Sequence, residues 1–104
     1  MASKIEKAVD VLLEAAPAGS KVILFGSHAR GDARPDSDLD FLVIEPKVAD
    51  HRDEMVRLHH VLRPLRVPAD VLVTTAALFE EWRDTPGTVL YDAAKEGRAF
   101  DAVR

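Results

Sequence analysis

The chain has 104 residues, which is enough for one domain with a single hydrophobic core and too few for a second core. Hydrophobic residues make up 47% and charged residues 31%, a composition typical of a folded domain and not of a disordered chain. With 14 Lys and Arg against 18 Asp and Glu, the formal charge is −4. The basic surface of a general nucleic-acid-binding protein is therefore not expected. We expect one domain over residues 1–104.

The sequence also constrains the compartment. It contains no cysteine, which excludes disulfides and Cys-containing zinc sites. The N-terminus lacks the apolar core of a signal peptide, and every apolar run is far shorter than the roughly 20 residues that cross a bilayer. These features predict a cytoplasmic protein that does not contact a membrane.

The first half of the chain alternates helical and strand-like patterns. Apolar residues recur at helical spacing until Pro17 and Gly19 end the pattern, and Ser27 is placed to cap a short helix. A stretch rich in turn formers then separates two apolar runs, and Pro46 ends the second of them. The expected elements are a helix over residues 5–16, a strand over 22–25, a short helix over 27–30, a loop over 31–37 and a strand over 38–44.

The second half repeats this alternation. Met55, Leu58, Leu62 and Leu65 follow 3-4-3 spacing, which indicates an amphipathic helix. Pro86 is expected in the first turn of the last helix. The expected elements are a helix over about 50–63, a strand over 69–74, a short helix over 76–83, a helix ending near residue 97, and either an edge strand or a fraying tail over 98–103.

Two carboxylates open the second strand. Residues two apart on a strand project from one face, roughly 6.6 Å apart, so Asp38 and Asp40 share a face while Leu39, Phe41 and Val43 face the opposite layer. Such a pair is electrostatically costly unless a cation lies between the carboxylates, and oxygen ligands suit Mg²⁺ or Mn²⁺. The pattern is typical of two-metal phosphoryl transfer, which usually needs a third carboxylate.

Asp70 is the candidate for the third carboxylate. It is the only acid inside the third apolar run, where an unpaired buried charge would be costly. Glu45 and Asp50 are the competing acids. Strand parity and the family pattern described below favour Asp70.

The glycine turn at Gly26 and Ser27 predicts phosphate binding. Glycine lets the backbone approach a phosphate closely, and the following helix start offers a hydroxyl and N–H groups. Arg30 and, less favoured, His28 lie on the same short helix and supply positive charge. Neither a P-loop nor a Gly-x-Gly-x-x-Gly motif is present, so this is a different kind of phosphate site.

The segment LFGSHARGDARPDSDLDFLV, residues 24–43, resembles the signature of the DNA polymerase beta-like nucleotidyltransferase superfamily. The small size and the segment PADVLV, which carries Asp70, are similar to its minimal nucleotidyltransferase branch. The resemblance implies an α+β fold with a small mixed sheet flanked by helices. It also implies that Gly26 and Ser27 bind the triphosphate of ATP and that Asp38 and Asp40 bridge two Mg²⁺ ions. Asp70 would bind the catalytic ion and accept the proton.

The same resemblance implies a partner. Many members of this branch pair with a helical HEPN-domain RNase toxin, and some transfer AMP from ATP to a tyrosine of that toxin. This chain would then be the antitoxin. Two alternatives remain open at this stage: an antitoxin that acts by binding alone, and a nucleotidyltransferase whose acceptor is a small molecule such as an antibiotic.

Other conspicuous side chains have plainer interpretations. The three histidines of the helix over residues 50–63 lie among arginines and are expected on a solvated face: His51, His59 and His60. Phe79, Trp82 and Tyr91 are expected to be core or interface residues without a catalytic role.

Overall fold

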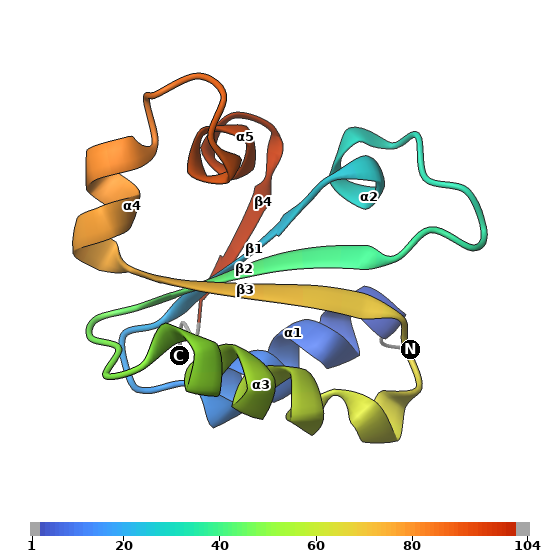
Figure 1. The fold of residues 1–104 in the computed structure, drawn as a ribbon. Helices are drawn as coiled ribbons and strands as arrows, with labels where there is room; N and C mark the ends of the chain where they lie inside the picture. Colours follow the sequence, from blue (N-terminus) through green and yellow to red (C-terminus); the bar gives the residue numbers. More distant parts are fainter. Residues whose placement is uncertain (1–2, 102–104) are drawn as a thin grey trace.

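The computed structural model describes residues 3–101, which form one four-stranded mixed sheet with helices on both faces (Figure 1). The strand order is β3-β2-β1-β4, with β2 and β3 parallel and the other two pairs antiparallel. The predicted α+β class is confirmed. The elements are α1 (Lys4–Ala15), β1 (Lys21–Phe25), α2 (Ser27–Arg30), β2 (Leu39–Glu45), α3 (His51–Val61), the 3-10 turn η1 (Arg63–Leu65), β3 (Ala69–Thr75), α4 (Ala76–Trp82), α5 (Val89–Glu96) and β4 (Arg98–Asp101).

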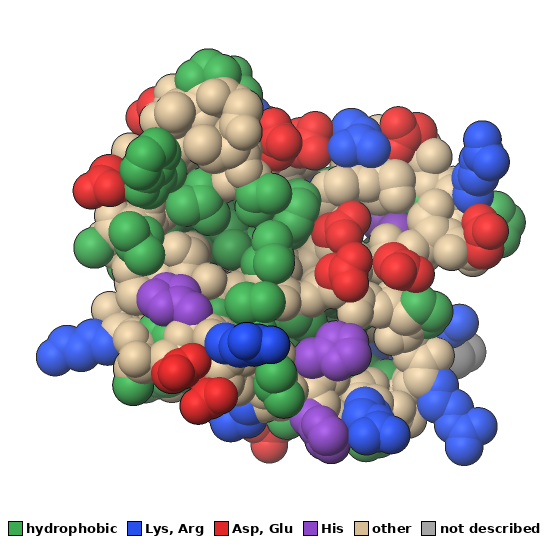
Figure 2. Space-filling model, in the orientation of Figure 1, with side chains coloured by type: hydrophobic (Ala, Val, Ile, Leu, Met, Phe, Trp, Pro, Cys, Tyr) green, Lys and Arg blue, Asp and Glu red, His purple; other side chains and the backbone are tan. Residues whose placement is uncertain are grey.

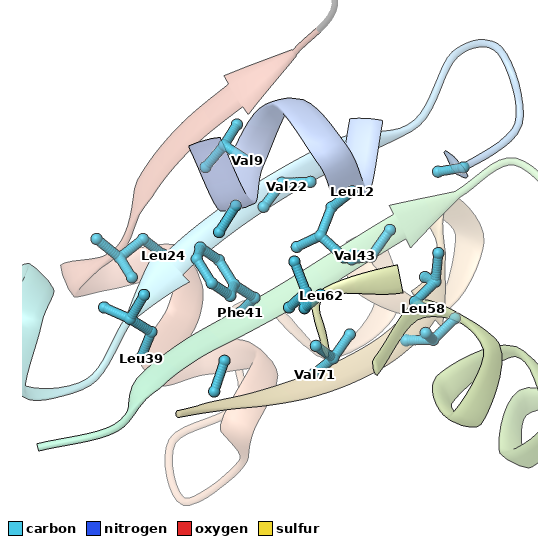
Figure 3. Packing of buried hydrophobic residues seen from close by; sticks show 14 residues of the cluster. Val9, Leu12, Val22, Leu24, Leu39, Phe41, Val43, Leu58, Leu62 and Val71 are labelled. Carbon is cyan, nitrogen blue, oxygen red and sulfur yellow. The ribbon is translucent and has the colours of Figure 1, made fainter. Parts of the chain in front are cut away.

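The two faces of the sheet are covered differently. Figure 1 shows α1 and α3 beneath the sheet, whereas α4 and α5 lie above one end of it and α2 above the other. The larger core lies between the sheet and the α1–α3 layer, and Leu12 of α1, Phe41 of β2 and Leu58 of α3 all belong to it (Figure 3). A smaller core lies under α4 and α5 and includes Leu42 and Phe79.

Strand β2 is central and almost entirely enclosed. Its odd-numbered residues Phe41 and Val43 enter the larger core, and the even-numbered Leu42 and Ile44 enter the smaller one. Asp40 is the one residue of this strand that is not buried. The α2 end of the upper face is therefore where the sheet opens to solvent.

Helix ends follow local capping chemistry, with two departures from the predictions. Thr88 caps α5 by accepting a hydrogen bond from the N–H of Tyr91, so Pro86 lies in the preceding turn and not in the helix. Gly26, not Ser27, is the N-cap of α2, because the helix begins at Ser27; the backbone of Gly26, at φ 75°, lies in a region that is open to glycine.

The remaining elements agree with the predicted order. The edge-strand alternative for the C-terminal segment is confirmed by the pairing of β4 with β1 over residues 98–101; residues 102 and 103 lie outside the described range. Within that range, no helix combines the length and apolarity needed to cross a membrane.

Candidate active site

The three predicted acids lie at one end of the sheet, where β1 ends and β2 and β3 begin. In the parallel pairing of β2 with β3, Asp40 is the direct partner of Asp70, and in the antiparallel pairing with β1 it lies opposite Phe25. Asp38 precedes the strand by one residue and shares the parity of Asp40. Strand register therefore places Asp40 and Asp70 on the upper face, and parity places Asp38 there as well. Figure 1 shows that α2 lies above this end of the sheet.

Exposure differs among these carboxylates. Asp38 and Asp70 are exposed, whereas Asp40 is half-buried. Asp70 therefore does not carry the cost of an unpaired buried charge that its apolar surroundings in the sequence raised. β3 is an edge strand, and Asp70 is its second residue on the face away from α3, so the apolar run around it does not enclose it.

The electrostatics of Asp40 reflect this crowding. Burial raises the pKa of its carboxyl above the ordinary value, and the neighbouring charges of Asp70 and Asp38 raise it further. His28 and Arg30 act in the opposite direction but do not outweigh these effects. At this end of the sheet, the negative charge of the acids therefore exceeds the positive charge that His28 and Arg30 supply.

Gly26 makes room for the Asp40 carboxylate. A Cβ atom on Gly26 would overlap Oδ2 of Asp40 and would lie 3.1 Å from its Cγ. The sequence suggested that this glycine serves phosphate approach. The structure adds a second requirement, because any side chain here would displace an acid of the site.

Other groups on α2 have protein partners. Arg30 forms ion pairs with Asp32, at 3.4 Å, and with Glu96, at 3.1 Å. The Nε2 atom of His28 lies 3.0 Å from the carbonyl oxygen of Ser37, a contact that places the proton on Nε2. His28 therefore holds the loop that leads into Asp38, and Arg30 reaches across to the end of α5.

Ser27 is the first residue of α2 and is half-buried. Its carbonyl oxygen accepts hydrogen bonds from the N–H groups of Gly31 and Asp32, at 3.0 and 3.1 Å. Backbone hydrogen bonds therefore hold the turn after β1 in place. They keep Ser27 beside Gly26 at the end of the sheet that carries the acids.

The two competing acids lie elsewhere. Glu45 is the last residue of β2, so it lies at the opposite end of the sheet, and its buried side chain is on the α3 face. Asp50 caps α3, accepting a hydrogen bond from the N–H of Asp53 at 3.0 Å. Neither is placed to join Asp38 and Asp40.

Comparison with known proteins agrees with this arrangement. A family model described as a nucleotidyltransferase domain matches residues 4–98. The chain belongs to this family. The glycine turn and the three acids all fall inside the matched region. No curated protein matches by sequence.

Two solved structures share the fold of this nucleotidyltransferase domain. One, from Sulfolobus solfataricus and provisionally described as a nucleotidyltransferase, has a TM-score of 0.64 at 22% identity, covering 93% of this chain and 76% of the other. The second is a toxin–antitoxin structure with AMP-PNP, with a TM-score of 0.60 at 17% identity, covering 89% of this chain and 69% of the other. At these identities the likeness shows the fold.

The three aspartates at this end of the sheet suit a divalent cation in both ligand chemistry and charge. Asp38, Asp40 and Asp70 offer the hard oxygen donors that Mg²⁺ and Mn²⁺ prefer, and their mutual repulsion is what a cation would relieve. Within residues 3–101, no three Asp, Glu or His side chains surround a common point as metal ligands. The three aspartates are therefore candidate ligands whose side chains would reorient to share an ion.

The nucleotidyltransferase domain also has a groove of about 520 Å³ that opens onto Asp40 and Asp70. Apolar side chains line most of it. Figure 2 shows hydrophobic side chains gathered below α4 and α5, with acidic side chains grouped beside them toward α2. His59 and His60 of α3 line the same groove, in addition to being exposed as predicted. Helical spacing identified their exposed face, but only the packing of α3 under β3 brings them to this groove.

Proposed function

We propose that this nucleotidyltransferase domain transfers AMP from ATP to a hydroxyl group, most simply a tyrosine, of a partner HEPN-type toxin and thereby neutralises it. Family membership supports nucleotidyl transfer, and the fold shared with a toxin–antitoxin structure supports a toxin partner. The observation that carries the proposal is the register pair Asp40–Asp70, which lies against Gly26 at one end and faces an open groove at the other.

The reaction would be an in-line displacement. The acceptor oxygen attacks the α-phosphorus of ATP, the bond from that phosphorus to the bridging oxygen breaks, and pyrophosphate leaves on the side of Gly26 and Ser27. Two divalent ions held by Asp38, Asp40 and Asp70 would supply charge neutralisation at the phosphates when bound. Asp70 would also accept the proton of the acceptor hydroxyl.

The division of roles among the acids follows their surroundings. Asp70 is exposed and lines the groove, through which an acceptor hydroxyl would enter. Asp40 is half-buried between Asp70 and Gly26, so it is suited to hold charge next to the nucleotide. Arg30 is assigned a supporting role, because Asp32 and Glu96 already bind its guanidinium and it would have to release them to meet a phosphate.

A transfer assay with two labels tests this function. The chain is co-purified with its helical partner and incubated with Mg²⁺ and ATP labelled at either the α- or the γ-phosphate. We expect the α-label on the partner and no γ-label, because pyrophosphate leaves. Asp38→Asn should abolish the transfer, whereas Asp36→Asn, an exposed acid of the preceding loop, should leave it unchanged. Absence of the α-label from every partner protein would refute the proposal that the chain transfers AMP.

Neutralisation by binding alone gives the opposite result in cells. If transfer is required, Asp38→Ala loses protection against the toxin while still co-purifying with it. If protection persists in Asp38→Ala, the chain acts by contact and the transfer proposal fails.

A further inference from the structure

The outer edge of β3 is free along the groove. β3 ends the sheet order, so within residues 3–101 no strand pairs with its outer side. Natural proteins usually protect such edges with charges, prolines or a covering element. Of the seven residues of β3, only Asp70 is charged. The main-chain groups of Val71 and Leu72 therefore border an apolar surface that an additional strand can reach.

The groove encloses this edge from both sides. Val71 faces the α3 layer and Leu72 faces the α4–α5 layer, yet both line the groove. Val56 of α3 forms part of one wall and Val89 at the start of α5 part of the other, and these side chains are 59% and 45% exposed. A strand projects successive side chains to opposite faces. An extended segment added to β3 would therefore place alternate side chains on the two walls.

A second cavity, of about 240 Å³, continues the groove beyond Asp70. It is lined by Arg63 and Arg66, and His59 lines both cavities. Neither arginine is within 4.0 Å of a carboxylate oxygen in the described part of the chain. Arg66 has the left-handed backbone φ of 53°, the one non-glycine residue with positive φ in that part. Charge complementarity therefore favours an acidic group on whatever occupies this cavity.

From these features we propose that the edge of β3 binds an extended polypeptide segment of the partner as a fifth strand. Apolar side chains of the segment would contact Val56 and Val89, its acceptor hydroxyl would lie at Asp70, and an acidic residue beyond the hydroxyl would meet Arg63 and Arg66. The role of the hydroxyl rests on the proposed function, whereas the docking does not. An apolar groove of this kind would disfavour a polycationic small molecule, which needs many polar contacts.

The binding half of this proposal is tested with peptides and no ATP. The probe is a fluorescent peptide with alternating valines, one tyrosine and two glutamates after it, and its binding to the full chain is followed by anisotropy. We expect binding by the wild type and a loss of at least tenfold in Val56→Glu. The matched control is Leu78→Glu, an exposed leucine of α4 outside the groove, which should bind normally.

The acidic contact is tested by charge reversal. Arg63→Glu should weaken the glutamate peptide and should bind a lysine version of the peptide better than the wild type does. Arg52→Glu, on an exposed position of α3 away from both cavities, serves as the control. Equal effects of Arg63→Glu and Arg52→Glu, or tighter binding of a single-stranded oligonucleotide than of the glutamate peptide, would overturn the proposal.

The two proposals fail in distinguishable ways. If α-label reaches the partner but the peptide does not bind and Val56→Glu transfers normally, the docking site is wrong and the enzyme stands. If the peptide binds with the expected variant pattern but no label is transferred, the proposed docking site is supported and the proposed AMP transfer is refuted.

Discussion

Asp40 and Asp70 are direct partners on the parallel strands β2 and β3, so their carboxyl groups lie on the same face of the sheet, near the start of both strands. Burial raises the pKa of Asp40, the more buried member of the pair, and the like charge of Asp70 raises it further. Structural packing alone would favour a neutral residue at the half-buried position of Asp40. The pair is therefore a local cost to folding, which is the common signature of a functional site.

Replacing Asp40 should separate function from stability. We expect Asp40→Asn to lower nucleotidyl transfer at least 100-fold, because a charged ligand of the transition state is lost. Its unfolding free energy should stay equal or rise by up to about 1 kcal/mol, because the repulsion from Asp70 and Asp38 is removed. Transfer kinetics and denaturant unfolding measure the two effects. A loss of stability greater than about 1 kcal/mol would show that Asp40 is a structural residue.

Magnesium should stabilise the folded chain through the same acids. A ligand that binds only the native state at 100 times its Kd adds about 2.7 kcal/mol. We expect Mg²⁺ to raise the Tm of the wild type and of Asp36→Asn, but not of Asp40→Asn or Asp70→Asn. Calorimetry across a Mg²⁺ series measures this. An equal rise in all four proteins would place the ion elsewhere.

Two glycines provide a matched test of the space beside Asp40. Gly31 has φ 86°, and a Cβ there meets nothing within 4 Å, so Gly31→Ala should cost only the strain of about 1–2 kcal/mol. Gly26→Ala should cost more, because its Cβ also collides with the Asp40 carboxylate and its backbone region is nearly restricted to glycine.

The contribution of the collision can be isolated by a double-mutant cycle. In an Asp40→Ala background, Gly26→Ala should lose part of its cost, whereas Gly31→Ala should cost the same as before. Urea unfolding of the wild type, the three single variants and the two double variants gives the comparison. Additive costs at Gly26 and Asp40 would mean that the carboxylate moves away without penalty.

A second acidic cluster, at the opposite end of β2, should make stability depend on pH. Arg57 donates to both carboxylate oxygens of Glu54, at 2.8 and 2.7 Å, and to the carbonyl oxygen of Ala15, at 2.9 Å. This pairing holds the pKa of Glu54 at about 2. Burial, together with the neighbouring carboxylate of Glu54, raises the pKa of Glu45 to about 7. Below about pH 7, Glu45 is therefore protonated beside an ionised Glu54 in the folded state.

The sign of the effect follows from the raised pKa of Glu45. The folded state binds this proton more tightly than the unfolded chain, whose carboxyl has the ordinary pKa of 4.5. The stabilisation is complete below pH 4.5 and is lost as the pH rises to about 7. We expect Glu45→Gln to flatten this slope, and the exposed control Glu14→Gln to retain it, in unfolding measured from pH 4.5 to 7.5. An unchanged slope in Glu45→Gln would contradict this assignment.

Local patterns in the sequence were sufficient for the elements and for part of the site. The alternation that buries Leu39 and Phe41 is a property of one strand, so it also places Asp38 and Asp40 together on the other face. The exposure of Asp70 could not be predicted from the apolar run around it, because the position of β3 at the edge of the sheet is not encoded in its own residues.

The sequence by itself determined the order of the helices and strands, the glycine turn and the shared face of Asp38 and Asp40, because these depend on neighbours only a few residues apart. Tertiary structure alone decided the parallel register that joins Asp70 to Asp40, the free β3 edge and the pairing of Arg30 with Glu96. Strand pairing and helix packing bring together segments distant in the chain, and the energy that selects them comes from burying whole faces. No short pattern carries that information.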